Sequence, residues 1–144
     1  MSIIKLTELA TKDTEIVYDE KYISSEIKKM DKKTLSIYLD FLKDKLVIEA
    51  KSTIKLFRDM NKHREKVAIK ETFNEIDIDY INNYYSLQYS YISLFSILFN
   101  SERSEKEQKK IDSLSEKQIQ NVKEKGKIIL IKLSMVYYKD FINN

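Results

Sequence analysis

Apolar residues recur every three or four positions along most of this chain, which is the spacing of one face of an α-helix. The clearest case runs from Asp31 to about Lys66, where charged residues flank a continuous apolar seam: Leu35, Tyr38, Leu42, Leu46, Ala50, Ile54 and Phe57. Asp31 is a good N-cap for this segment, because its side chain accepts a hydrogen bond from the first turn. The pattern predicts one long helix there and two shorter helices over residues 2–30.

The stretch from Tyr80 to Ser101 holds no charged residue and differs from the rest of the chain. Its apolar residues point in nearly all directions, which is typical of a helix covered by its neighbours. Asn82, Asn83 and Gln88 interrupt it, so we do not expect it to span a membrane. We predict a buried central helix, about residues 80–100, around which charged amphipathic helices pack.

The C-terminal third carries helix signals of its own. Residues 101–113 form a charged segment, either a loop or a solvated helical extension. Two capping boxes follow, in which a serine and an acid or amide three residues later bind each other's backbone: Ser113 with Glu116, and Ser115 with Gln118. Gly126 either ends the next helix or marks a close contact inside a longer one. The β-branched run that follows has no second strand to pair with, so we assign it to a helix.

The composition sharpens the fold class. The chain has 144 residues, of which 42% are hydrophobic and 34% charged, with a single glycine and no proline. Strands and tight turns depend on glycine and proline, whereas helix interiors exclude both. We therefore predict one all-α domain over residues 1–144, a bundle of about five to seven helices.

Several classes of chemistry are excluded by residue types that the chain lacks. There is no cysteine for a disulfide or thiolate metal site, and one histidine rules out a histidine-rich metal site. There is no glycine-rich phosphate loop either. We expect no cofactor, no metal and no enzymatic activity, and the absence of a signal-peptide pattern favours the cytoplasm. Abundant Lys, Ile, Asn and Tyr suggest an A/T-rich genome, such as that of a low-GC bacterium, its phage or mobile element, or a large DNA virus.

A basic stripe recurs along the second half of the long predicted helix. Its members are spaced three or four residues apart and share one helix face: Lys51, Lys55, Arg58, Lys62 and Lys66. Such a stripe is either a solvated face or a contact for phosphates of RNA or DNA, or for an acidic protein. Glu49, Asp59 and Glu65 dilute its charge, and the net charge of the chain is only +3.

The same segment contains Arg58-Asp59-Met60-Asn61-Lys62-His63. This hexapeptide resembles the R-polar-x-x-x-H motif of HEPN-type ribonucleases, which are small all-helical domains. The resemblance implies metal-independent RNA cleavage, in which Arg58 stabilises phosphate charge and His63 acts as general acid–base across a dimer. Here the motif lies before the midpoint of the chain and late in a long helix, whereas the family commonly carries it late in the bundle and near a helix start.

Tyrosines crowd the central stretch, among them Tyr84, Tyr85, Tyr89 and Tyr91. Tyrosine is amphipathic and enriched at binding surfaces, yet helical aromatic residues also serve as core. Rings that face solvent would be candidates for anchoring a protein partner.

The leading hypothesis is a non-enzymatic protein-interaction module of the inhibitor, immunity-protein or antitoxin type, or a phage or viral factor that modulates a host. Its expected binding residues are Tyr84, Tyr85, Tyr89, Tyr91, Lys51, Lys55, Lys62 and Lys66. We expect a protein partner, with homodimerisation left open. The HEPN-like ribonuclease that uses Arg58 and His63 is the first alternative, and nucleic-acid binding by the basic stripe is the second.

Overall fold

The computed structural model describes residues 18–67, 78–100 and 102–143, and these residues form five helices and no strand. The bounds are α2 (Glu20–Lys29), α3 (Lys32–Val67), α4 (Ile78–Phe99), α5 (Glu105–Asp112) and α6 (Glu116–Ile142). The all-α prediction is confirmed, and five helices in the described residues compare with the five to seven expected for the whole chain. The first of the helices predicted within residues 2–30 lies outside the described residues.

Most of these helices begin at side-chain caps that the sequence encodes. The Asp31 carboxylate accepts the Thr34 backbone N–H at 2.7 Å, which confirms the predicted start of α3. Ser115 and Gln118 form the predicted capping box of α6, while Ser113 is the C-cap of α5 and forms no box. A capping box of Ser104 with Glu107 starts α5, so the charged segment after Ser101 is partly helical.

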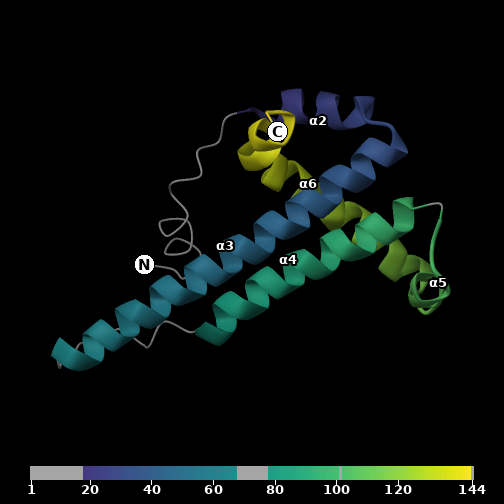
Figure 1. Ribbon diagram of the computed structural model, residues 1–144. Coiled ribbons are helices and arrows are strands. Elements are labelled where there is room, and N and C mark those ends of the chain that lie inside the picture. The colour runs from purple at the N-terminus through teal and green to yellow at the C-terminus, as the bar shows by residue number, and fades with distance from the viewer. Residues whose placement is uncertain (1–17, 68–77, 101, 144) are drawn as a thin grey trace.

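The long helix α3 and the shorter α4 lie side by side as an antiparallel pair (Figure 1). Helix α6 packs across both of them and also contacts α2, while α5 sits against α4. Helix α6 lies toward one end of the pair, so that the C-terminal part of α3 and the N-terminal part of α4 extend beyond it (Figure 1). This overhang leaves two helices of the bundle without a third at that end, within the described residues.

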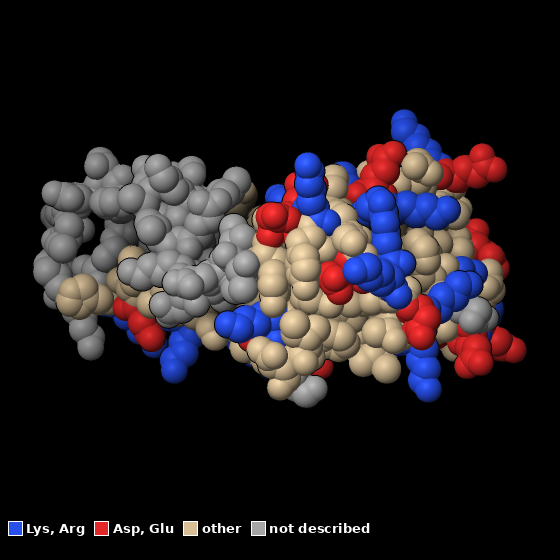
Figure 2. All heavy atoms as spheres, turned by 90° about the horizontal axis from the view of Figure 1, so that it is seen from above, with Lys and Arg blue, Asp and Glu red and all other residues tan. Residues whose placement is uncertain are grey.

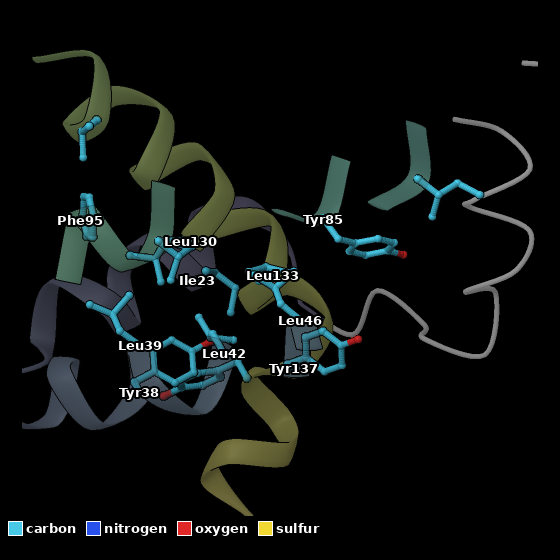
Figure 3. Close-up of a cluster of buried hydrophobic side chains, with 14 of the residues drawn as sticks. Ile23, Tyr38, Leu39, Leu42, Leu46, Tyr85, Phe95, Leu130, Leu133 and Tyr137 are labelled. Carbon is cyan, nitrogen blue, oxygen red and sulfur yellow. The ribbon is translucent and has the colours of Figure 1, made fainter. Parts of the chain in front are cut away.

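The core lies where α2, α3, α4 and α6 meet, and Figure 3 shows its side chains pointing toward one another. Its most deeply buried members come from all four helices: Ile23, Tyr38, Leu39, Leu42, Leu46, Phe57, Ile81, Ile92 and Leu130. Burial of such side chains is the main force that holds amphipathic helices together. The apolar seam predicted for α3 is largely this core.

The single glycine fixes how closely α6 approaches α4. Gly126 lies in the middle of α6, and a Cβ atom placed on it would fall 2.6 Å from Cδ2 and 2.9 Å from Cβ of Phe95. Only a residue without a side chain fits against the Phe95 ring at that distance. Of the two predicted roles for Gly126, a close contact inside a longer helix is the correct one.

The prediction that the central helix is buried needs correction. Helix α4 matches the expected bounds, but only Ile81, Tyr85, Ile92 and Phe95 are fully buried. The pattern misleads because uncharged residues are present all around the helix, whereas α3, α5 and α6 cover only part of its circumference. Among the described residues no helix is long and apolar enough to cross a membrane.

Candidate interaction surfaces

The four tyrosines singled out in α4 divide into buried and exposed rings. Tyr85 is buried, with 4% of its surface exposed, and Tyr91 is half-buried. Tyr84 and Tyr89 are 38% and 41% exposed. They are five residues apart, or about 140° around the helix, so they lie on opposite flanks of its buried face. The structure therefore does not gather these tyrosines into one surface.

Tyr84 belongs instead to a different stripe, formed with Tyr80, Leu87 and Tyr91 at spacings of four, three and four residues. Helix α6 covers this stripe at Tyr91, where Asn121 donates to the tyrosine hydroxyl at 3.3 Å and Lys125 lies over the ring. Toward the start of α4 the stripe becomes exposed, at 58% for Leu87, 38% for Tyr84 and 42% for Tyr80.

Helix α3 shows the same change along its length. Glu49 contacts α6 through Tyr137, and Leu56 follows it by seven residues, which is two helical turns along the same face. Leu56 and Met60 are both exposed large apolar residues. We call Leu56, Met60, Tyr80, Tyr84 and Leu87 the open apolar surface. Its members lie on the overhang, on the side of the helix pair that α6 covers elsewhere.

A polar node inside the bundle joins α3, α4 and α6. The two carboxylate oxygens of Glu49 accept hydrogen bonds from Tyr85 at 3.2 Å and from Tyr137 at 2.7 Å. The Thr53 hydroxyl lies 3.3 Å from that of Tyr85. Burial, reinforced by the Glu49 carboxylate, raises the pKa of both tyrosines well above its usual range. Hydroxyl groups that stay protonated in this way serve as structural hydrogen-bond donors. The sequence did not predict these two contacts with Glu49, because the partners are 36 and 88 residues apart.

The basic stripe is fully on the surface as far as the structure describes it. Lys51, Lys55, Arg58 and Lys62 are exposed on the side of α3 that faces away from the core. Within the described residues no salt bridge includes any of the four. The side chain of Lys66 lies outside the described residues. These cations are therefore available to a negatively charged partner.

Arg58 and His63 are both exposed but do not converge within one copy of the chain. Five residues separate them, so their side chains leave α3 in directions about 140° apart. A shared phosphate would need one of the two groups from a second copy. This geometry leaves the ribonuclease hypothesis dependent on one particular dimer.

Other features that would signal an active site are weak in the described part of the chain. No group of three or more acidic or histidine side chains is placed to hold a metal ion there. One surface hollow lies on α2, but a single helix lines it, so it is an open depression: Glu20, Lys21, Ser24, Ser25, Lys28 and Lys29. An enclosed catalytic pocket normally draws residues from several elements.

Comparison of the chain with protein-family models, curated proteins and solved structures finds no match.

Proposed function

We propose that this protein is a non-enzymatic interaction protein that binds another protein through the open apolar surface. The observation that supports this most directly is the change along the α4 stripe, which α6 covers at Tyr91 and leaves exposed at Tyr80, Tyr84 and Leu87. Exposed apolar residues scattered singly are ordinary on a protein surface, whereas a contiguous group marks a contact site. Helix pairs present such groups to partner helices through residues spaced three, four and seven apart.

The chemistry of the surface fits a protein partner better than a small molecule. Tyr80 and Tyr84 bring large rings with polar hydroxyls, a combination enriched at interfaces, and Leu56, Met60 and Leu87 surround them with aliphatic groups. Met adapts its shape readily to an opposing surface. A small, charged helical protein of this kind is well suited to act as an inhibitor, immunity protein or antitoxin, or as a phage or viral factor that binds a host protein.

The test is a pair of substitutions at matched exposure. Leu87 is 58% exposed in α4, and Ile128 is 55% exposed on the outer side of α6. The wild-type chain is used to isolate a partner from its native cell, and affinity is then measured with both proteins purified. We expect Leu87→Asp to weaken binding by about tenfold or more, as for an interface residue near the centre of a contact. We expect Ile128→Asp to stay within about twofold.

Two outcomes would contradict the proposal. Equal affinity of the Leu87→Asp and wild-type proteins for the partner would place the binding site elsewhere. Metal-independent cleavage of RNA by the purified protein, lost on replacing His63 with Ala, would favour the HEPN-like ribonuclease instead.

A further inference from the structure

The outer face of α3 carries a second, separate pattern that neither the fold nor the proposed function uses. Exposed side chains recur along it at intervals of three or four residues, about three and a half on average: Ile37, Asp40, Asp44, Ile48, Lys51, Lys55, Arg58 and Lys62. This is the period of a seam along which two helices lie side by side over many turns. No other helix of the described residues covers these side chains, and Ile37 and Ile48 are 55% and 60% exposed.

Charge along this face is divided into two halves. After Lys33 at its start, the N-terminal half carries Asp40 and Asp44, and the C-terminal half carries Lys51, Lys55, Arg58 and Lys62. Asp40 has 66% of its side chain exposed and pairs with Lys43 of the next turn, at 3.0 Å. Asp59 lies on the flank of the basic half rather than in its centre. One face of one helix therefore presents an acidic segment and a basic segment end to end.

Such a face is complementary to itself when two copies meet in opposite directions. A symmetric dimer uses the same patch on both subunits, so each acidic half meets a basic half. A twofold axis between Ile48 and Lys51 places Asp44 level with Lys55 of the second copy and brings Asp40 near its Arg58. Ile48 then packs beside the aliphatic stem of the opposing Lys51. A parallel arrangement would instead place like charges opposite each other.

We propose that the outer face of α3 is an antiparallel homodimer interface between two copies of this chain. It lies on α3 opposite the buried face, so the dimer contact and the open apolar surface do not overlap. Because most of its pairs are exposed to solvent, the dimer is held weakly and dissociates as salt rises.

The proposed dimer bears on the ribonuclease hypothesis. With the axis between Ile48 and Lys51, Arg58 of one copy and His63 of the other lie about 33 Å apart along the helices, at 1.5 Å per residue. The two groups cannot share one phosphate at that distance. A dimer of this geometry is therefore a scaffold for binding, and it does not assemble a composite catalytic site.

The experiment is a charge swap read by sedimentation velocity at about 0.05 M and about 0.5 M salt. Variant one is Asp40→Lys with Asp44→Lys, and variant two is Lys55→Glu with Arg58→Glu. Each puts like charges opposite each other where positions 40 and 44 of one copy meet positions 55 and 58 of the other, so we expect self-association to weaken by about tenfold or more in each. Mixing the two variants restores dimers, because the positive charges introduced at positions 40 and 44 of one variant meet the negative charges introduced at positions 55 and 58 of the other. Combining all four substitutions in one chain also restores them.

The control pair is Lys123→Glu with Lys127→Glu, which makes the same charge change on exposed positions of α6 and leaves the dimer intact. Circular dichroism confirms that every variant remains helical. Leu87→Asp also leaves the dimer intact, so failure of this inference is distinguishable from failure of the proposed function.

Three results would overturn the inference. One is a wild-type protein that stays monomeric at low salt up to about 0.5 mM, well above the Kd of a functional weak dimer. Another is a dimer that survives in both charge variants. The third is a monomer that binds an RNA or DNA oligonucleotide and loses this binding only in the Lys55→Glu, Arg58→Glu variant, which would assign the basic half to phosphate contacts instead.

Discussion

Hydrogen bonds made by buried hydroxyl groups connect the helices of this bundle. Tyr38 donates to the Ser134 hydroxyl at 2.6 Å, and Ser134 in turn donates to the Leu130 carbonyl at 2.6 Å. Both side chains are completely buried. Tyr138 reaches Glu26 of α2 at 3.0 Å in a similar way. Each contact satisfies a polar group that would otherwise be costly to remove from water.

The Tyr38–Ser134 pair gives a prediction at the scale of single residues. Ser134→Ala leaves the buried Tyr38 hydroxyl without its acceptor, so we expect the free energy of unfolding to fall by about 1–3 kcal/mol. Tyr38→Phe combined with Ser134→Ala removes both partners, so the double variant should be more stable than Ser134→Ala alone. Urea unfolding followed by circular dichroism measures both. A double variant less stable than Ser134→Ala would show that the hydroxyls do not depend on each other.

At the scale of elements, the crossing of α6 over α4 depends on one missing side chain. Gly126→Ala improves helix propensity by up to about 1 kcal/mol, but the added methyl group collides with the Cβ and ring of Phe95. The Cβ and Cγ atoms of Phe95, both 2.9 Å from the position of the added methyl group, lie at the root of the side chain and cannot swing away. We therefore expect a net loss of about 1–3 kcal/mol in the free energy of unfolding, as for other overpacked cores.

The control for that prediction is an alanine substitution at an exposed position of α6. Lys127→Ala changes a neighbouring exposed residue and should leave stability within about 0.5 kcal/mol of the wild type. A second variant, Gly126→Ala with Phe95→Ala, removes the collision between α6 and α4 but also loses the buried Phe95 ring. If Gly126→Ala alone proved more stable than the wild type, the close contact would not limit the approach of the two helices.

Helix identity and many helix ends were readable from the sequence because both depend on neighbouring residues. Asp31 caps α3 and the Ser115–Gln118 box caps α6, in each case through contacts between residues three positions apart. The Ser104–Glu107 capping box also involves residues only three positions apart, but it was not predicted because it lies within a run of charged residues that could equally be a loop. Arg103, whose guanidinium donates to the Ile97 and Leu98 carbonyls at 2.9 and 2.8 Å, closes the end of α4 in a way that no short motif signals.

The exposure of each tyrosine was not readable in the same way, because it depends on contacts between distant segments. Tyr84 and Tyr85 are adjacent in an uncharged stretch, yet one is exposed and the other buried. Tyr85 faces α3, where Glu49 and Thr53 contact its hydroxyl, whereas Tyr84 lies on the flank of α4 that α6 covers only farther along, at Tyr91. The basic stripe was predictable because its spacing alone places it on one face of a helix. The open apolar surface was not, because its exposure depends on how far along α3 and α4 the helix α6 packs.

The whole molecule should lose stability at alkaline pH. Burial raises the pKa of Tyr38, Tyr85 and Tyr137 well above the value of about 10 in an unfolded chain, and burial with the Glu26 carboxylate raises the pKa of Tyr138 to about 12. Above pH 10 the unfolded chain releases protons that the folded chain retains. The stabilisation is therefore present below pH 10 and lost as the pH rises through the folded values, at up to about 1.4 kcal/mol per pH unit for each proton.

Urea unfolding between about pH 9 and pH 12 measures this dependence. Tyr138→Phe removes one of the four groups, so its free energy of unfolding should fall less steeply with pH than that of the wild type. Tyr89→Phe changes an exposed tyrosine of α4 and serves as the control for the loss of a hydroxyl. A wild-type stability that stays constant up to pH 12 would contradict the prediction.

The contacts that α6 makes with α2 and α3 have a consequence for synthesis on the ribosome. Tyr138 meets Glu26 across 112 residues, and Ser134 meets Tyr38 across 96. A nascent chain that has completed α4 must wait for the next 43 residues before α6 can cover its core, which takes about 2–9 s at 5–20 residues per second. During that interval α6 does not yet cover the core side chains of α3 and α4. The chain is then most exposed to chaperones and proteases, and to encounters with neighbouring nascent copies of itself.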